Sequence, residues 1–171
     1  MMRIFKLLAG VSIALAFTAP VMAQVSGQGG PIRVKADRSE VLDQERKVLL
    51  IDNVDITQGD ARLRADIVTL AYGGEGNSAA TSGVGAFGDI ESMTARGNVF
   101  YVTPDLKATG DLGVYDARNE TITLTDNVVL VRGDDVAKGE RLVMNLAAGV
   151  TTLDGAGSQV NMVIIPKEGE D

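Results

Sequence analysis

The side chains that could carry chemistry in this sequence are mainly carboxylates, because its 171 residues include no histidine and no cysteine. Imidazole bases, thiolate nucleophiles and Cys/His zinc sites are therefore excluded. The Gly-x-Ser-x-Gly and Ser-x-x-Lys motifs of serine hydrolases are absent as well. Two converging aspartates could still catalyse acid–base chemistry, so a carboxylate-dependent hydrolase stays open as a minor alternative.

The aspartates, however, recur at matching places along the chain, where Asp and Asn favour turns by bonding their own backbone. The Gly133-Asp134-Asp135 run could suggest calcium, but the EF-hand loop pattern is absent. We therefore expect turn-forming aspartates, no metal, no cofactor and no enzymatic activity. The turn positions are Asp52, Asp60, Asp105, Asp126 and Asp134.

These positions belong to an internal repeat. LIDNVDITQGDARLRAD (50–66) and LTDNVVLVRGDDVAKGE (124–140) share one layout, and a third copy aligns at Asn98. Asn98 precedes Asn127 by 29 residues, and Asp111 precedes Asn127 by 16, as Asp37 precedes Asn53. Fixed spacing of this kind indicates stacked supersecondary units.

Each unit has the two-residue alternation of a half-buried strand. Thr121 to Thr125 alternates, Asp126-Asn127 is predicted to turn the chain, and a new strand is expected from Val128 to Val131. No segment after residue 23 has a convincing helical period. The stretch from Gly73 to Asp89 holds six glycines and is predicted to be a long loop.

Alternation gives every unit one aliphatic face, which must be buried against a second sheet. A sandwich, a jelly roll or a trough would each satisfy this requirement. Arg62, Arg64, Lys107 and Lys138 fall on the opposite face, which we expect to be solvated; a contact line for an anionic head group is the alternative. The predicted inner face comprises Ile32, Val34, Val48, Leu50, Val54, Ile56, Leu63, Val99, Tyr101, Ile122, Leu124, Val128, Leu130, Leu142 and Met144.

A sheet of stacked units ends in two unpaired strands, which can pair with another chain. The C-terminal strand has no charge from Gln159 to Ile165, whereas the N-terminal one carries basic side chains. We therefore predict head-to-tail self-association; a tail or leader that folds back and caps the edge is the alternative. The expected assembly edges are Ile32, Arg33 and Val34 at one end and Val160, Met162, Val163 and Ile164 at the other.

The first 23 residues have the features of a secretory signal peptide. Arg3 and Lys6 precede an apolar run that is too short for an ordinary membrane span, and Val21-Met22-Ala23 fits a cleavage site after Ala23. An uncleaved anchor is the alternative. We expect an exported protein with a flexible leader (24–30), one domain (31–166) and a polar tail (167–171). Its net charge of −7 argues against nonspecific nucleic-acid binding.

Four segments, PIRVKAD (31–37), DNVDITQG (52–59), LRAD (63–66) and VNMVIIP (160–166), resemble the OstA-like domain of the LptA family of periplasmic lipopolysaccharide-transport proteins. The resemblance implies an all-β, elongated antiparallel β-jelly roll of about sixteen short strands, open at both ends.

It also implies that the inner face binds the lipid A acyl chains of lipopolysaccharide in the periplasm. Copies would join head to tail, with LptC-like inner-membrane and LptD-like outer-membrane partners, into a bridge between the membranes. The alternative is a self-assembling structural β-repeat protein without lipid cargo.

Overall fold

The computed structural model of the protein describes residues 31–73 and 89–165. The predicted signal peptide, the leader, most of the glycine-rich loop and the polar tail lie outside this part of the chain. None of the helical structure within it is long and apolar enough to cross a membrane. The elements are β1 (Ile32–Lys35), β2 (Arg38–Leu42), a 3-10 turn η1 (Asp43–Glu45), β3 (Lys47–Gln58), β4 (Ala61–Gly73), β5 (Asp89–Val102), β6 (Lys107–Asp116), β7 (Thr121–Arg132), β8 (Asp135–Asn145), β9 (Val150–Asp154) and β10 (Asn161–Val163).

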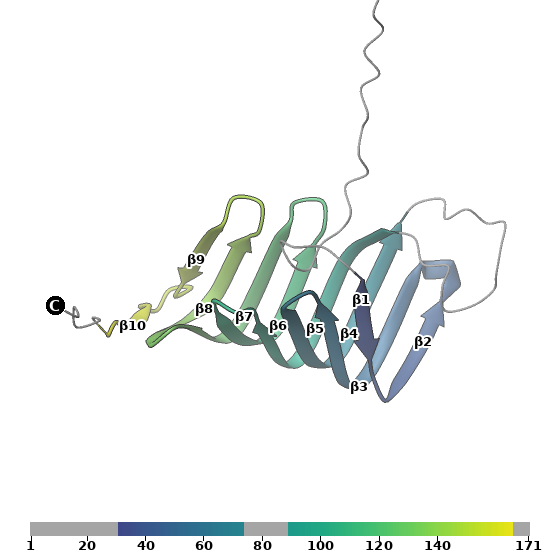
Figure 1. Ribbon diagram of the computed structural model, residues 1–171, viewed down its shortest axis with the longest axis horizontal. Coiled ribbons are helices and arrows are strands. Elements are labelled where there is room, and N and C mark those ends of the chain that lie inside the picture. The colour runs from purple at the N-terminus through teal and green to yellow at the C-terminus, as the bar shows by residue number, and fades with distance from the viewer. Residues whose placement is uncertain (1–30, 74–88, 166–171) are drawn as a thin grey trace, which may run out of the picture.

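All strands belong to one antiparallel sheet that follows the chain order (Figure 1). The path is β1-β3-β4-β5-β6-β7-β8-β10, with β2 also paired to β3 and β9 also paired to β8. Each end of the sheet therefore consists of two short strands on one long neighbour. Since consecutive strands pair, the chain builds a stack of rungs with two exposed ends, one N-terminal and one C-terminal.

The long strands bend sharply near their middle, and in β3, β5 and β7 two consecutive residues at the bend adopt left-handed backbone conformations. The φ angles are 59° and 51° at Asp52 and Asn53, and 65° and 54° at Asp126 and Asn127. The sequence prediction that Asp126-Asn127 ends one strand was wrong, as it was for Asp52-Asn53. Both pairs lie inside β3 and β7, where the register shifts by one residue and the ladder continues. The bend is a corner in a strand.

A side-chain hydrogen bond crosses the corner between neighbouring rungs. Asn53 Nδ2 donates to Asp37 Oδ2 at 2.6 Å, and Asn127 Nδ2 donates to Asp111 Oδ2 at 2.6 Å. The 16-residue spacing found in the sequence repeat is therefore the separation between an aspartate and the asparagine that hydrogen-bonds to it. In β5 the corner residues are Gly97 and Asn98, with φ angles of 75° and 47°, and Asn98 Nδ2 donates to Asp66 Oδ2 at 2.9 Å.

The corners divide the sheet into two arms that share their strands. The resemblance implied about sixteen short strands, whereas the described residues form ten, because a corner bends the ladder without ending it. Divided at its corner, each rung contributes one segment to each arm. The first arm holds β1, 54–58, 61–65, 99–102, 107–110, 128–132, 135–139 and β10; the second holds β2, 47–51, 67–73, 89–96, 112–116, 121–125, 141–145 and β9.

The core lies between the arms, since buried side chains alternate with exposed ones along each strand. This alternation holds for the long strands, whereas the short end strands have no buried residue. In β7, for example, Ile122, Leu124 and Val128 are buried, and the two-residue corner keeps Val128 on the inner side. Leu124, Leu142 and Val68 are completely buried. The hydrophobic cluster runs without a break from β3 to β8.

The corner bond yields a first testable prediction. Asn127→Ala should lower the free energy of unfolding by about 1–2 kcal/mol, because alanine is unfavourable at positive φ and the bond to Asp111 is lost. Asn127→Gly loses the bond but tolerates the backbone conformation, so its loss should be smaller. Urea unfolding monitored by circular dichroism measures both. Wild-type stability in the alanine variant would contradict this account of the corner.

Candidate functional site

The structure places most of the predicted inner-face residues between the arms. Leu130 and Ile32 are partly buried against the cluster. Val34 differs from the prediction, because β1 is an end strand and leaves 41% of this residue exposed. The buried members are Val48, Leu50, Val54, Ile56, Leu63, Val99, Tyr101, Ile122, Leu124, Val128, Leu142 and Met144.

Sequence reasoning missed inner-face residues on the far side of three corners, those of β4, β5 and β6. Val68 in β4 and Met93, Ala95 and Tyr115 in β5 and β6 are all buried. The signal was available, because the alternation resumes beyond the corner once the strand is allowed to continue. This continuation was concealed because the corner was treated as the end of a strand and the stretch from Gly73 to Asp89 was treated as a loop.

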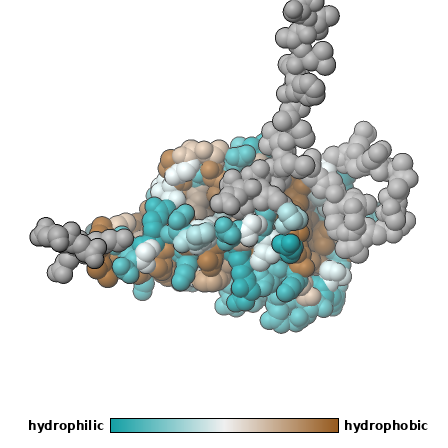
Figure 2. Space-filling model, in the orientation of Figure 1, coloured by the Kyte–Doolittle hydropathy of each residue, from teal (hydrophilic) through white to brown (hydrophobic). Residues whose placement is uncertain are grey.

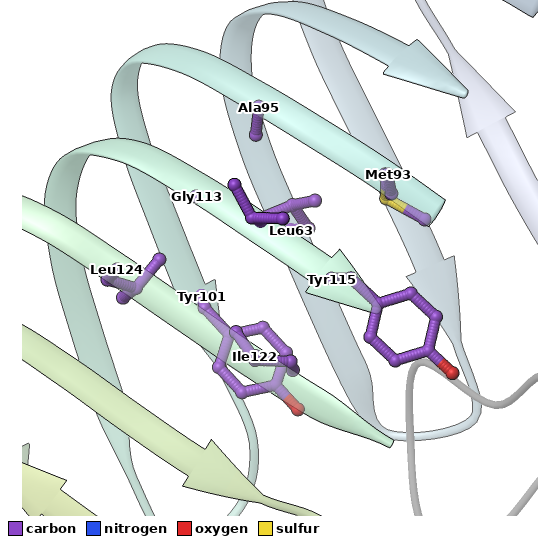
Figure 3. Close-up of a pocket in the computed structure, with 9 residues that line it drawn as sticks. Leu63, Met93, Ala95, Tyr101, Gly113, Tyr115, Ile122 and Leu124 are labelled. Carbon is purple, nitrogen blue, oxygen red and sulfur yellow. The ribbon is translucent and has the colours of Figure 1, made fainter. Parts of the chain in front are cut away.

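The middle of the interior is a narrow apolar cavity of about 20 Å³ (Figure 3). The cavity is small because the surrounding side chains pack closely. Even a Cβ atom added to Gly113 would lie only 3.1 Å from both Leu124 Cδ2 and Val99 Cγ1. A volume of this size is close to the minimum for one water molecule. The lining residues are Leu63, Met93, Ala95, Tyr101, Gly113, Val114, Tyr115, Ile122 and Leu124.

A larger pocket of about 410 Å³ lies between the hairpin ends of the two arms, on the side away from the corners. Asp60, Thr103 and Arg132 contribute from the first arm, and Asn145 and Gly149 from the second. We call this pocket the mouth. Tyr101 lines both the mouth and the inner cavity, so it stands between them.

The two buried tyrosines are polar groups on an otherwise aliphatic wall. Burial raises the pKa of Tyr101 to about 12, and the nearby Tyr115 adds to the rise. Their hydroxyl groups point to the same end of the cavity (Figure 3). The Tyr101 phenol is therefore neutral at physiological pH, and it adds no formal charge to the interior.

The predicted basic positions lie on the outer face of the first arm. Arg62 makes a two-pronged ion pair with Asp55, in which Arg62 Nε donates to Asp55 Oδ1 at 2.8 Å. Arg64 Nε lies 3.9 Å from Asp55 Oδ2. The hydrogen bond from Arg62 lowers the pKa of Asp55 despite its partial burial, and the charges of Arg62, Arg64 and Lys35 add to this effect. Lys107 and Lys138 are exposed on the same side.

Both ends of the sheet expose large apolar side chains. At the C-terminal end, Met162, Val163, Ile164 and Ile165 are 55–64% exposed, and hydrophobic surface gathers there (Figure 2). Val160 at this end is 37% exposed. At the N-terminal end Arg33 lies beside Val34 and Ile32 on β1.

Sequence reasoning missed that each end has a second strand. β2 forms the other half of the N-terminal end and β9 the other half of the C-terminal end. Val41 on β2 and Val150 on β9 are 44% and 56% exposed. Both arms therefore present an unpaired edge at each end of the molecule.

The aspartates at the predicted turn positions lie in connections between strands or at corners within them, and two of them, Asp60 and Asp105, line the mouth. Asp60 and Asp134 occupy tight hairpin connections, and Asp105 lies in the connection between β5 and β6. In residues 31–73 and 89–165 no three acidic side chains are arranged to hold a metal ion.

Comparison with known proteins gives relatives along nearly the whole chain. An uncharacterized protein, R00383, of Rhizobium meliloti (strain 1021) is 30% identical over 95% of this chain and 86% of its own length. Lipopolysaccharide export system protein LptH of Pseudomonas aeruginosa is 28% identical over 96% and 93%. Lipopolysaccharide export system protein LptA of Escherichia coli (strain K12) is 24% identical over 94% and 84%.

The fold agrees with a solved structure as well. The crystal structure of LptH, the LptA homologous periplasmic component of the lipopolysaccharide transport device of Pseudomonas aeruginosa, superposes with a TM-score of 0.65 at 24% identity, over 80% of this chain and 96% of that one. The family model of the LptA/(LptD N-terminal domain) LPS transport proteins matches residues 33–150. This chain therefore belongs to that family, which confirms the resemblance read from the sequence.

Proposed function

We propose that this protein is a periplasmic lipopolysaccharide carrier that shields the lipid A acyl chains between its two arms. The observation that carries the proposal is the continuous aliphatic inner face. It runs through every rung from β3 to β8 and ends at apolar side chains at both ends of the sheet. Acyl chains gain free energy from leaving water for such a surface, roughly 0.8 kcal/mol per buried methylene.

The lipid would enter through the mouth, where the hairpin ends of the arms meet. The inner cavity of about 20 Å³ is far too small for an acyl chain. Loading must therefore separate the arms on the mouth side, while the hydrogen-bonded corners act as the hinge. The phosphorylated sugar of the lipid would stay outside, because no buried cation lines the cavity to pair with it.

Transfer would occur along a row of copies, without covalent chemistry in this chain. The apolar edges at both ends fit head-to-tail pairing with a second copy, with an LptC-like partner at the inner membrane or with an LptD-like partner at the outer membrane. Such a contact does not close on itself and can extend into a bridge. The second candidate, a structural β-repeat assembly without cargo, uses the same edges but assigns no role to the mouth.

Lipid binding can be tested at two adjacent positions. Leu124 is completely buried, whereas Thr123 faces the outer side. Leu124→Asp should abolish lipopolysaccharide binding in native mass spectrometry and lower the melting temperature, because an unpaired buried carboxylate is costly. Thr123→Asp adds the same charge outside and should leave both nearly unchanged. Equal behaviour of the two variants would show that the inner face is assigned wrongly.

Edge pairing can be tested with a proline. Thr103 N donates to Leu106 O, and hydrogen-bonded pairs alternate along antiparallel strands. This alternation can be followed from that bond across β5 to β8. It directs the backbone N–H and C=O groups of Met162 away from β8, to the free edge. Met162→Pro removes this donor and should weaken head-to-tail association about tenfold in sedimentation velocity, with the monomer still folded.

Met162→Ala is the matched control, since it removes the same side chain and keeps the backbone donor. Its association should lie closer to the wild type than that of the proline variant. Identical association constants for the two variants would argue against strand pairing at this edge.

A further inference from the structure

The inner rows of side chains are exposed only where they reach the ends of the sheet. In the first arm one row begins at Val34, 41% exposed, and ends at Met162, 58% exposed, with Ile56, Leu63 and other buried residues between. In the second arm another row begins at Val41 and ends at Thr151. Each row would continue without interruption if the C-terminal end of one copy met the N-terminal end of the next.

Backbone hydrogen bonding agrees with this continuation in the first arm. The two-residue hairpin between Gln58 and Ala61 makes them a bonded pair, so alternation directs the backbone groups of Val34 to the free edge. The same count directs those of Met162 to the opposite free edge. Val34 and Met162 therefore belong to one row, and each directs its backbone donor and acceptor outward. An antiparallel ladder between two copies needs such a pair.

The second arm gives the same result independently. Tyr72 N donates to Arg46 O, which leaves the backbone groups of Ser39 and Val41 on β2 at the free edge. Leu146 N donates to Glu120 O, which leaves those of Thr151 and Leu153 on β9 at the other edge. Val41 shares its row with Thr151, and Ser39 shares its row with Leu153. Both arms therefore match in a single register.

This register brings one pair of opposite charges together on the outer face. Arg38 begins β2 and Asp154 ends β9, and both belong to the row beside the corner. The Arg38 side chain is 65% exposed and forms an ion pair with Glu40 on its own strand; Asp154 is exposed and forms no ion pair within the described residues. In a continued sheet the two stand directly opposite each other.

We propose that Arg38 of one copy and Asp154 of another form an ion pair across the contact between them, which we call the joint. This pair sets the register in which the second copy of this chain docks, with β10 of one copy on β1 of the other and β9 on β2. The inference rests on the head-to-tail association proposed above. A slip of one residue would turn every inner side chain outward. A slip of two residues would keep the faces but could set Asp154 against Glu40, and like charges directly opposite destabilise a sheet. The proposed register sets Asp154 opposite Arg38, which attracts it, and keeps it away from Glu40, which would repel it.

Charge reversal on separate copies tests the pair. Arg38→Glu alone places two carboxylates opposite each other at every joint, and Asp154→Arg alone places two guanidinium groups there, so each should associate about tenfold more weakly than the wild type at low salt. In an equimolar mixture the two variants can alternate along the row, and every joint of such a row then has opposite charges. Its sedimentation profile should return to that of the wild type. Arg96→Glu is the control, because Arg96 lies exposed in the same outer row but in the middle of the sheet.

The outcomes separate the register from the association itself. A mixture that associates no better than its components, while the wild type assembles, overturns the register and leaves head-to-tail pairing intact. A wild type that stays monomeric at every concentration overturns both. An effect of Arg96→Glu as large as that of Arg38→Glu would attribute the loss to net charge and refute the specific pair. Thermal melts that coincide with the wild type verify that each variant is folded.

Discussion

The hydrogen bond from a corner asparagine to an acid on the neighbouring rung is the interaction on which the rest of the structure depends. It holds the chain in left-handed conformations in the middle of long strands, at a place where a straight ladder would be more favourable. With the corner fixed, each strand belongs to two arms, and the apolar faces of both arms meet. Without it, the same alternation would produce a flat sheet with one face exposed to water. The repeated Asp-Asn motif thus creates the interior, although it contributes no side chain to it.

A stack of bent rungs has a consequence that a closed barrel avoids: both arms end in unpaired strands. The apolar rows that are buried throughout the molecule become exposed at Val34, Val41 and Met162. Exposed edges of this kind are usually blocked by charges, prolines or bulges. Here β10, the C-terminal edge strand of the first arm, has none of these blocks, and the rows of the two ends match in phase. The proposed enclosure of lipid and the proposed joining of copies would therefore both follow from this one arrangement of strands.

How much of this was predictable from the sequence depends on how local each feature is. Strand periodicity and the alternating inner face are local, and they predicted an all-β fold and residues such as Leu124 and Val54, which the structure places in the core. The choice of a jelly roll over a sandwich or a trough came from the family resemblance. The corner looked like an ordinary turn, because Asp and Asn favour both, and only pairing with a strand 16 residues away distinguishes them. That ambiguity hid Met93 and Tyr115. The second edge strands, β2 and β9, were missed for a related reason: their place at the ends depends on long-range pairing, which the repeat spacing does not contain.

The central claim is that lipid contacts the inner face and not the outer one. Photocrosslinking amino acids placed in cells at Leu124 and, in separate cells, at Thr123 test it directly, because the two positions are adjacent in β7 and face opposite sides. The account predicts a lipopolysaccharide adduct at position 124 and none at position 123. No adduct at position 124, or equal adducts at both, would contradict it.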